Sequence, residues 1–262
     1  EMTSSLVGSE MCIRDRGKWV FVHELKLTDF PKKIVYPFDV FAVQEIFRKG
    51  SLSFEQPVTF LSGDNGTGKS TILEAIAVAY GINPEGGSQN FNFQTVESHS
   101  ELHESVRLVR KGNLPKTKFF LRSETYYNVA SELEYMAKDD GEVAFASYGG
   151  KSLHTRSHGE GLLSIIENRF GKEGFYLLDE PEAGLATSRQ YTLLREIHRL
   201  VETGSQLIIA THSPILMAYP AATIYQFSEA GLEQLPLEET LAYKETKLFY
   251  DDHKRMLHYL LD

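Results

Sequence analysis

One segment of the chain, residues 63–70, constrains the fold more than any other. It reads Gly-Asp-Asn-Gly-Thr-Gly-Lys-Ser and fits G-x-x-x-x-G-K-[S/T], the pattern of a glycine-rich loop that binds phosphate groups. The apolar, β-branched residues 58–61 precede it and predict a buried strand. Residues 71–80, rich in alanine and free of proline and glycine, predict a helix. Strand, glycine-rich loop and helix are the setting that such a loop requires.

The residue types explain how this loop would hold a nucleotide. Gly66 and Gly68 can take positive φ, so the loop N–H groups and the helix N-terminus can face the phosphates closely. Lys69 would reach the β- and γ-phosphates, and the Ser70 hydroxyl would bind Mg²⁺. The alternative, a glycine-rich turn that only caps a helix, leaves the flanking strand unexplained. The predicted nucleotide-binding residues are Gly63, Asp64, Asn65, Gly66, Thr67, Gly68, Lys69, Ser70 and Thr71.

An acidic pair, Asp179 and Glu180, directly follows the apolar residues 175–178. Ligands of open α/β sheets bind at the carboxyl ends of the strands, so this pair is expected beside the phosphate loop. Asp179 would hold Mg²⁺ directly or through water, and Glu180 would position or deprotonate the attacking water. The alternative is an acidic strand end that faces solvent.

Residues 157–161, Ser-His-Gly-Glu-Gly, come before a predicted helix. Ser157 and Glu160 fit S-x-x-E, a capping box. A capping box does not need glycine, which is unfavourable in a first helical turn, whereas small residues at a helix N-terminus also make an anion site. Both interpretations, a plain cap and an anion site, stay open from these residues alone.

His212 follows the apolar residues 207–210, which predict a further core strand. A single histidine is usually structural, but at this strand end it is expected next to the γ-phosphate. We therefore predict two catalytic residues, Glu180 and His212.

The composition bounds the function. Lysine and arginine number 27 against 36 aspartate and glutamate, which gives a net charge of −9. This charge argues against a uniformly basic nucleic-acid surface, although a run of basic residues between 107 and 122 leaves a local patch open. The single cysteine, Cys12, excludes a disulfide framework and suits a reducing cytoplasm. The sequence contains no run of 18 apolar residues, so no membrane span is expected.

Strands that alternate with helices predict an α/β fold with a mostly parallel sheet. Strands are expected at 19–27, 50–57, 58–61, 116–122, 175–178 and 207–210, with a hairpin at 223–227 and 232–235. Helices are expected at 71–80, 98–110, 125–138, 157–170, 188–203 and 240–261, and residues 30–43 as a loop or edge strand. Residues 1–17 show neither the helical nor the strand periodicity of apolar residues, and they are expected to be a non-native or disordered tail. Residues 18–262 would form one domain with a helical subdomain inserted at about 85–165.

The order and spacing of these motifs resemble ABC-type ATPases. Ser157, Gly159 and Glu160 match their signature L-S-G-G-[QE], whereas Arg156 and His158 depart from it, and His212 resembles their switch histidine. A longer set of segments is similar to the bacterial stand-alone predicted ATPases of the AAA/ABC-like group, whose members resemble the heads of SMC-like proteins. These segments are 83–88, 157–160, 177–183 and 209–216.

The resemblance implies a P-loop NTPase of ABC-ATPase type with an antiparallel β part. It implies ATP as substrate, Mg²⁺ as cofactor and a head-to-tail dimer in which Ser157, His158, Gly159 and Glu160 contact the partner's nucleotide. It also implies a glutamine that binds the metal, for which Gln94 is the first candidate and Gln89 the second.

Three functions stay open at this point. The first is a cytoplasmic, Mg²⁺-dependent ATPase that dimerises with ATP and gates an unknown protein effector. The second is the nucleotide-binding subunit of a membrane transporter. The third is a nucleotide-gated module in DNA repair or anti-phage defence.

Overall fold

The computed structural model describes residues 20–84, 87, 102–124, 126–140, 145, 148–150 and 152–261. The expected tail at residues 1–17 lies outside these ranges, as do both candidate glutamines, Gln89 and Gln94. For residues 136 and 138–140 only the backbone is described.

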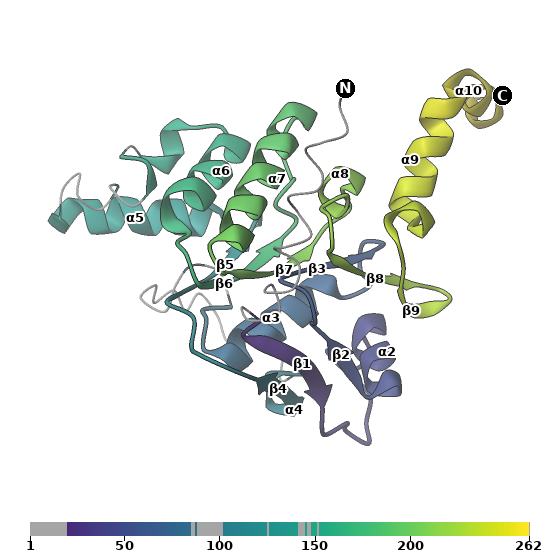
Figure 1. Cartoon of the computed structure of the whole chain (residues 1–262), viewed down its shortest axis with the longest axis horizontal. Helices are drawn as coiled ribbons and strands as arrows, with labels where there is room; N and C mark the ends of the chain where they lie inside the picture. The colour runs from purple at the N-terminus through teal and green to yellow at the C-terminus, as the bar shows by residue number, and fades with distance from the viewer. Residues whose placement is uncertain are drawn as a thin grey trace, which may run out of the picture.

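A six-stranded sheet forms the centre of the molecule (Figure 1). In spatial order it contains β5 (Thr117–Arg122), β6 (Gly174–Asp179), β7 (Gln206–Ala210), β3 (Val58–Gly63), β8 (Thr223–Ser228) and β9 (Gly231–Gln234). All neighbouring pairs are parallel except β8 and β9, which form the expected antiparallel hairpin. The prediction of a mostly parallel sheet with an antiparallel part is therefore confirmed.

A second sheet has three antiparallel strands and lies beside the first. Its central strand β1 (Val22–Leu27) pairs with β2 (Ser51–Ser53) on one side and with β4 (Val106–Arg110) on the other. This sheet and helix α3 lie on one face of the six-stranded sheet, whereas α5, α6, α7 and α8 lie on the other (Figure 1).

The described ranges contain helices of very different length. They are α2 (Phe41–Lys49), α3 (Lys69–Tyr80), α4 (Leu102–Ser105), α5 (Tyr126–Asp140), α6 (His158–Arg169), α7 (Thr187–Glu202), α8 (Pro214–Met217), α9 (Leu241–Asp251) and α10 (His253–Leu261), with short 3₁₀ turns at Leu153–Thr155 and Leu237–Glu239. Among the described residues, no helix has the length and apolar character that a bilayer span requires.

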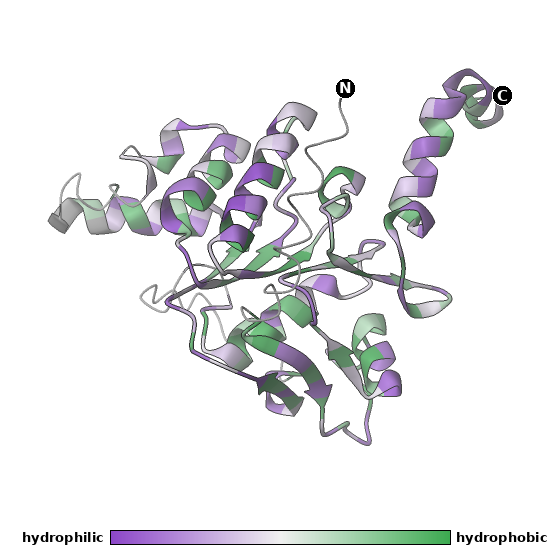
Figure 2. Ribbon diagram, in the orientation of Figure 1, coloured by the Kyte–Doolittle hydropathy of each residue, from purple (hydrophilic) through white to green (hydrophobic). Residues whose placement is uncertain are grey.

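Alternate residues of the parallel strands pack into two separate cores. On β6, Tyr176 and Leu178 belong to the core under α5–α8, whereas Phe175 and Leu177 belong to the core around α3. Side chains of a strand point alternately to opposite faces, so a strand covered on both faces is apolar throughout. Figure 2 shows the apolar sheet with the mostly apolar α3 on one face and with α6 and α7, which also carry hydrophilic residues, on the other.

Two helix assignments made from the sequence are wrong. Residues 98–110 were expected to be helical, but the described part contains only the four-residue α4 and then strand β4. Val106 and Leu108 alternate with the exposed Arg107 and Val109, which suits a strand, and β1 supplies the antiparallel partner that fixes it. Helix α2 was missed because Pro31 and Pro37 suggested a loop or edge strand over residues 30–43. In the structure this loop ends at Val40, and α2 begins at Phe41.

The segment expected as a helical insert, about 85–165, also contains β4 and β5, which belong to the two sheets. The long helices described within this segment are α5 and α6. In this segment, the described helical structure that covers the sheet therefore begins at Tyr126.

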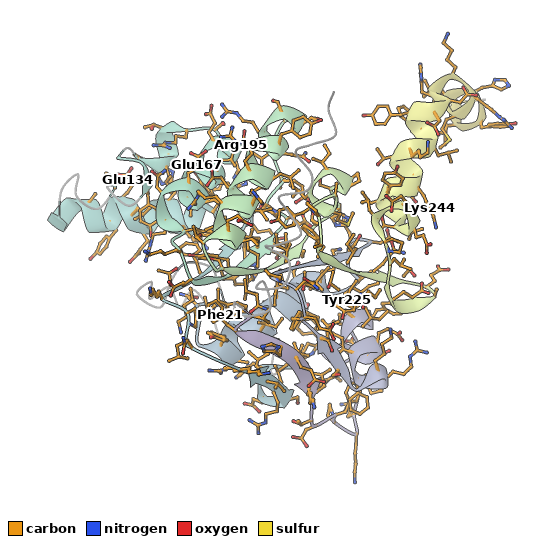
Figure 3. The ribbon with its side chains drawn as sticks, in the orientation of Figure 1. Phe21, Glu134, Glu167, Arg195, Tyr225 and Lys244 are labelled. Atoms are coloured by element: carbon orange, nitrogen blue, oxygen red, sulfur yellow. The ribbon has the colours of Figure 1, made fainter. Side chains whose placement is uncertain are left out.

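A buried amide joins the two sheets. Gln206, the first residue of β7, is fully buried. Its Oε1 accepts hydrogen bonds from the Phe21 and Val22 backbone N–H groups at 2.8 and 2.9 Å, and its Nε2 donates to the Val22 carbonyl at 2.8 Å. Figure 3 labels Phe21 at this junction. The side chain thus makes hydrogen bonds with three backbone groups of Phe21 and Val22.

Gln206→Leu should therefore destabilise the protein by about 2–4 kcal/mol, because it leaves buried N–H donors without acceptors. Chemical denaturation measures this loss. Gln234→Leu, at an exposed position of β9, is the control and should change the free energy of unfolding by less than about 0.5 kcal/mol. Equal effects of the two substitutions would contradict the role of Gln206.

Candidate functional site

The phosphate loop connects the carboxyl end of β3 to the N-terminus of α3, as predicted. Gly63, Gly66 and Gly68 all have positive φ, at 143°, 80° and 99°. A Cβ atom on Gly68 would lie 2.0 Å from Val40 Cγ1, and one on Gly63 would lie 2.4 Å from the Phe227 carbonyl oxygen. These two glycines therefore serve close packing as well as backbone conformation, and any side chain there would distort the loop.

Lys69 lies inside the loop and is only 4% exposed. Its ammonium group donates hydrogen bonds to the Gly63 and Asp64 carbonyl oxygens at 2.7 and 2.8 Å. Burial lowers the pKa of Lys69, and the nearby carboxylates of Glu180 and Asp179 act in the opposite direction. Because carbonyl dipoles and carboxylates surround it, the lysine can hold its charge where an anionic phosphate would bind.

Ser70 and Asp179 meet across the gap between α3 and β6. The Ser70 hydroxyl donates a hydrogen bond to Asp179 Oδ1 at 3.0 Å, although the two residues are 109 positions apart in the chain. Burial raises the pKa of Asp179 to about 6, even though Arg122 and the Ser70 hydroxyl lower it. The protein thus leaves a buried carboxylate without full charge compensation.

This pair fits Mg²⁺. Hydroxyl and carboxylate oxygens are the donors that this hard cation prefers, and it commonly takes only one or two protein carboxylates and shares the rest of its shell with phosphates and water. No group of three or more His, Cys, Asp or Glu side chains within the described ranges could hold a metal on its own. The donor set therefore suits a cation that arrives with a nucleotide.

Arg122 is a member of this site that the sequence did not reveal. We expected it within a solvated basic run, but its side chain is only 15% exposed. It lies opposite Asp179 in the β5–β6 register, with Nε 3.7 Å from Asp179 Oδ2 and Nη1 3.4 Å from Glu74 Oε2. The position of Arg122 at the end of a predicted strand was the available signal, because it places the charge at the same sheet edge.

The structure brings Glu180 and His212, the two residues predicted to be catalytic, close to each other. Glu180 Oε1 lies 3.5 Å from His212 Nε2, a buried atom without a hydrogen bond to the described residues. Glu180 has φ of 50°, a left-handed conformation that is strained for a residue with a side chain. Its N–H donates to the Ala210 carbonyl at 2.9 Å and its carbonyl accepts from Ser123 Oγ at 2.6 Å. These bonds hold the carboxylate next to the histidine.

Glu182 fixes the backbone that carries His212, which the sequence did not predict. Its Oε1 accepts hydrogen bonds from Thr211 Oγ1 at 2.6 Å and from the His212 N–H at 2.7 Å. The segment after β6 and the segment after β7 are thereby connected at the carboxyl edge of the sheet. A movement of one would be transmitted to the other.

Residues 157–161 form the N-terminus of α6 with the capping box predicted from the sequence. Ser157 accepts from the Glu160 N–H, and the hydrogen bond from Ser157 lowers the pKa of Glu160. A Cβ on Gly159 would lie 2.7 Å from the Gly184 carbonyl, and one on Gly161 would lie 1.6 Å from Tyr126 Oη. Packing therefore explains both glycines, and their presence is not in itself evidence for an anion site.

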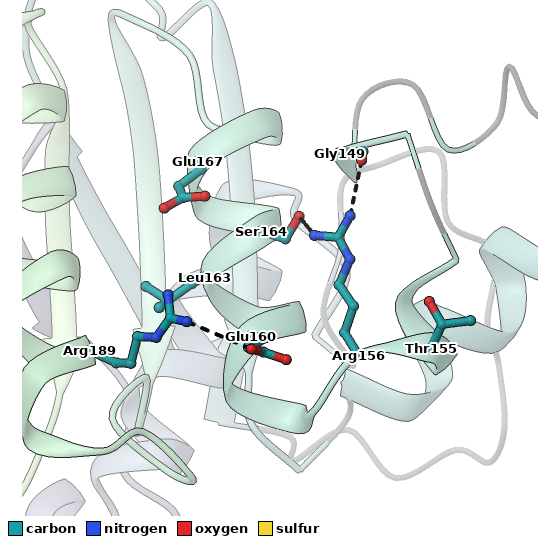
Figure 4. A pocket seen from close by; sticks show the side chains of 8 residues that line it. All are labelled: Gly149, Thr155, Arg156, Glu160, Leu163, Ser164, Glu167 and Arg189. Atoms are coloured by element: carbon teal, nitrogen blue, oxygen red, sulfur yellow. Dashed lines mark hydrogen bonds and ion pairs between the residues drawn. The ribbon is translucent and has the colours of Figure 1, made fainter.

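The side chains beside this cap form a groove of about 560 Å³ along α6 (Figure 4). Glu160 pairs with Arg189 at 3.7 Å, and Arg156 donates to the Ser164 hydroxyl and the Gly149 carbonyl. His158 packs edge-on against Tyr126 at 4.8 Å. These interactions stay on the α5–α7 side of the molecule, so Ser157 to Glu160 do not join the phosphate loop of the same chain.

Known proteins resemble the chain over most of its length. A family model described as "AAA domain" matches residues 45–174, and one described as "AAA domain, putative AbiEii toxin, Type IV TA system" matches residues 155–218. An "Uncharacterized ABC transporter ATP-binding protein" of Haemophilus influenzae is 24% identical over 222 residues, which cover 78% of this chain and 82% of that protein.

Other similar proteins are more distant in length or in structure. The ABC multidrug transporter MDR1 of Trichophyton interdigitale is 24% identical over 173 residues, which are 60% of this chain. The match spans only 11% of that transporter. The SMC head domain from Thermotoga maritima has a TM-score of 0.43 at 15% identity, covering 83% of this chain and 99% of that structure.

The raised pKa of Asp179 predicts how the metal-free protein responds to pH. A carboxyl group whose folded pKa of about 6 exceeds its ordinary value of 3.8 binds more protons in the folded than in the unfolded state. Its contribution to stability is therefore full below about pH 4 and is lost as pH rises through about 6. Asp179→Asn should gain stability relative to the wild type between pH 5 and pH 8, by about 1.4 kcal/mol, because part of the contribution of Asp179 is already lost at pH 5.

Urea denaturation of both proteins in the presence of a chelator, at pH 5 and pH 8, measures the difference. Other titrating groups are shared and cancel in the comparison. If the free energies of unfolding of the two proteins differ by the same amount at pH 5 and at pH 8, burial does not raise the pKa of Asp179 and the prediction is wrong.

Proposed function

We propose an ATP-hydrolysing function from one premise: the chain belongs to the AAA/ABC-type P-loop ATPases. We infer that it binds ATP with Mg²⁺ at the phosphate loop and hydrolyses the bond between the β- and γ-phosphates. The observation that carries this proposal is the hydrogen bond of 3.0 Å between Ser70 and the buried Asp179. Ser70 directly follows Lys69, which is also buried.

Each residue of the loop has a distinct role in this proposal. The N–H groups of 66–71 surround the phosphates, and Lys69 exchanges its carbonyl partners for phosphate oxygens. Ser70 and Asp179 would hold Mg²⁺, which neutralises phosphate charge as it develops in the transition state. Asn65 and Thr67 are expected to shape the loop, where Thr67 Oγ1 already donates to the Asp64 carbonyl at 2.8 Å.

Glu180 would position the attacking water and accept its proton, since its carboxylate is 43% exposed and leaves a free approach. His212 Nε2, buried and without a hydrogen bond to the described residues, would contact the γ-phosphate. Glu182 would keep the two residues in register by holding the His212 backbone. Gln94, which lies outside the described residues, stays a proposed metal contact.

We further propose that two copies join head-to-tail with ATP between them. Ser157 and Glu160 are exposed. They hydrogen-bond each other, and Glu160 also pairs with Arg189 at 3.7 Å, which leaves their exposed side open to a nucleotide held by a second copy. His158 and Gly159 would complete this contact. The ATP-bound dimer would then gate a protein effector, and direct nucleic-acid binding has no support from the net charge of −9.

A transporter subunit is the second candidate. The relative from Haemophilus influenzae that carries the transporter name matches 78% of this chain, which favours this alternative. Recovery of the native chain in complex with a membrane protein would support it over a gated effector. The third candidate, a module in DNA repair or defence, would instead be recovered with a nuclease or toxin.

Glu180→Gln should trap the ATP-bound dimer. The amide keeps the shape of the side chain but cannot accept the proton of the attacking water, whereas Lys69, Ser70 and Asp179 still bind ATP. The variant should be monomeric without nucleotide and dimeric with ATP and Mg²⁺, because the bound state favours association. Light scattering on a sizing column measures both species.

Ser157→Arg added to Glu180→Gln should abolish this dimer, because a long side chain would block the second half of the site. Tyr191→Arg, at an exposed position of α7, is the matched control and should leave the dimer intact. A Glu180→Gln protein that binds ATP and stays monomeric, or a dimer unaffected by Ser157→Arg, would refute the head-to-tail arrangement.

A further inference from the structure

The last two helices, α9 and α10, form an arm that has little contact with the rest of the molecule. They have no buried residue, and Figure 1 shows them projecting beyond the sheet. The arm exposes large apolar side chains on both helices. These include Leu248, Phe249, Tyr250, Leu257, Leu260 and Leu261, with exposed fractions from 39% to 78%. An apolar surface of this kind indicates an interaction site.

The base of the arm borders the nucleotide site. A cavity of about 190 Å³ lies between the first turns of α9 and the phosphate loop. Leu241, Glu245 and Thr246 line it on one side, and Asp64 and His212 line it on the other. The arm thus begins at the site where ATP is proposed to bind.

Two hydrogen bonds help to hold this base in place. The Leu241 N–H donates to Gln226 Oε1 at 2.7 Å, and Thr240 Oγ1 caps α9 by accepting from the Tyr243 N–H. Gln226 lies on β8 opposite Ser62 in the parallel register, directly before the phosphate loop. The direction of the arm is therefore fixed by the strand that neighbours the loop.

The groove along α6 has features complementary to this arm. It combines apolar Leu163 with two carboxylates, Glu160 and Glu167, and two guanidinium groups. Arg189 pairs with Glu160, and Arg156 is engaged by Ser164 and Gly149. Glu167 is exposed and has no interaction with the described residues, as Figure 4 shows. Leu163 is itself only 3% exposed, so the groove offers mainly polar groups and, in Glu167, one free negative charge.

The arm offers a matching positive charge. Lys244 is exposed on α9 and its side chain makes no interaction within the described part of the chain, whereas Lys247 is paired with Asp251 at 2.6 Å. Figure 3 labels Lys244 on the arm and Glu167 on α6, at well-separated places of one molecule. A contact between them requires two molecules.

We propose that the arm of one copy docks into the α6 groove of a second copy when ATP joins the two. This inference rests on the head-to-tail dimer of the proposed function. In that arrangement, the phosphate loop of one copy faces the α6 N-terminus of the other, and the arm and the groove extend outward from these two half-sites. Two-fold symmetry repeats the contact, so each copy holds the other. The nucleotide state at His212 would then control whether the arm is docked.

Cross-linking tests the contact directly. The protein carries Glu180→Gln to retain ATP and Cys12→Ser to remove its single natural thiol. Lys244→Cys and Glu167→Cys introduce one thiol on the arm and one in the groove. A short bismaleimide should give a covalent dimer with ATP and Mg²⁺ and none without nucleotide. Lys111→Cys with Glu167→Cys, whose first thiol lies in the exposed β4–β5 turn, should give none in either condition.

Light scattering on the same samples separates the two proposals. A dimer with ATP that cross-links through residues 244 and 167 supports the docked arm. A dimer that does not cross-link overturns the docked arm and leaves the proposed function intact. Absence of any ATP-dependent dimer overturns both.

Charge reversal provides an independent measurement. Lys244→Glu and Glu167→Lys should each shift the ATP-bound dimer toward monomer, and the double variant should restore it. Lys111→Glu is the control and should have no effect. An equal loss in the double variant would contradict the pairing of the two charges.

Discussion

The contact between Ser70 and Asp179 is the interaction on which the functional part of the structure depends. The carboxylate of Asp179 is buried in the interior, where an isolated charge is strongly unfavourable. Arg122 and the Ser70 hydroxyl compensate only in part, so the pKa of Asp179 is still raised to about 6. A cation bound between the two oxygens would remove this cost, and the fold therefore supplies a site that favours a metal together with an anionic ligand.

The remaining structure positions the two sides of this contact. Ser70 is fixed because α3 begins at Lys69, immediately after a glycine whose close approach to Val40 allows no side chain. Asp179 is fixed because β6 lies between β5 and β7 and is buried along its whole length. The same sheet edge carries Glu180 and His212, so the proposed phosphate, metal and water sites would be neighbours by topology.

The sequence predicted those parts of the site that depend on local order. The phosphate loop, the acidic pair after β6 and the histidine after β7 each follow an apolar strand, and parallel strands end at the same edge. Arg122 could not be assigned in this way, since its partner Asp179 is 57 residues away and only the β5–β6 register brings them together. Strand β4 was likewise mistaken for a helix, because its partner β1 comes from a segment far earlier in the chain. Glycine gave a further misleading signal, since Gly159 and Gly161 serve packing against Gly184 and Tyr126.

Calorimetric titration with a non-hydrolysable ATP analogue tests the central claim most directly. The account predicts tight binding to the wild type with Mg²⁺, and much weaker binding both with a chelator and in Asp179→Asn with Mg²⁺. The contribution of the metal to affinity then depends on the Ser70–Asp179 pair. Equal affinity in all three measurements would contradict the claim that this buried carboxylate holds the metal of a bound nucleotide.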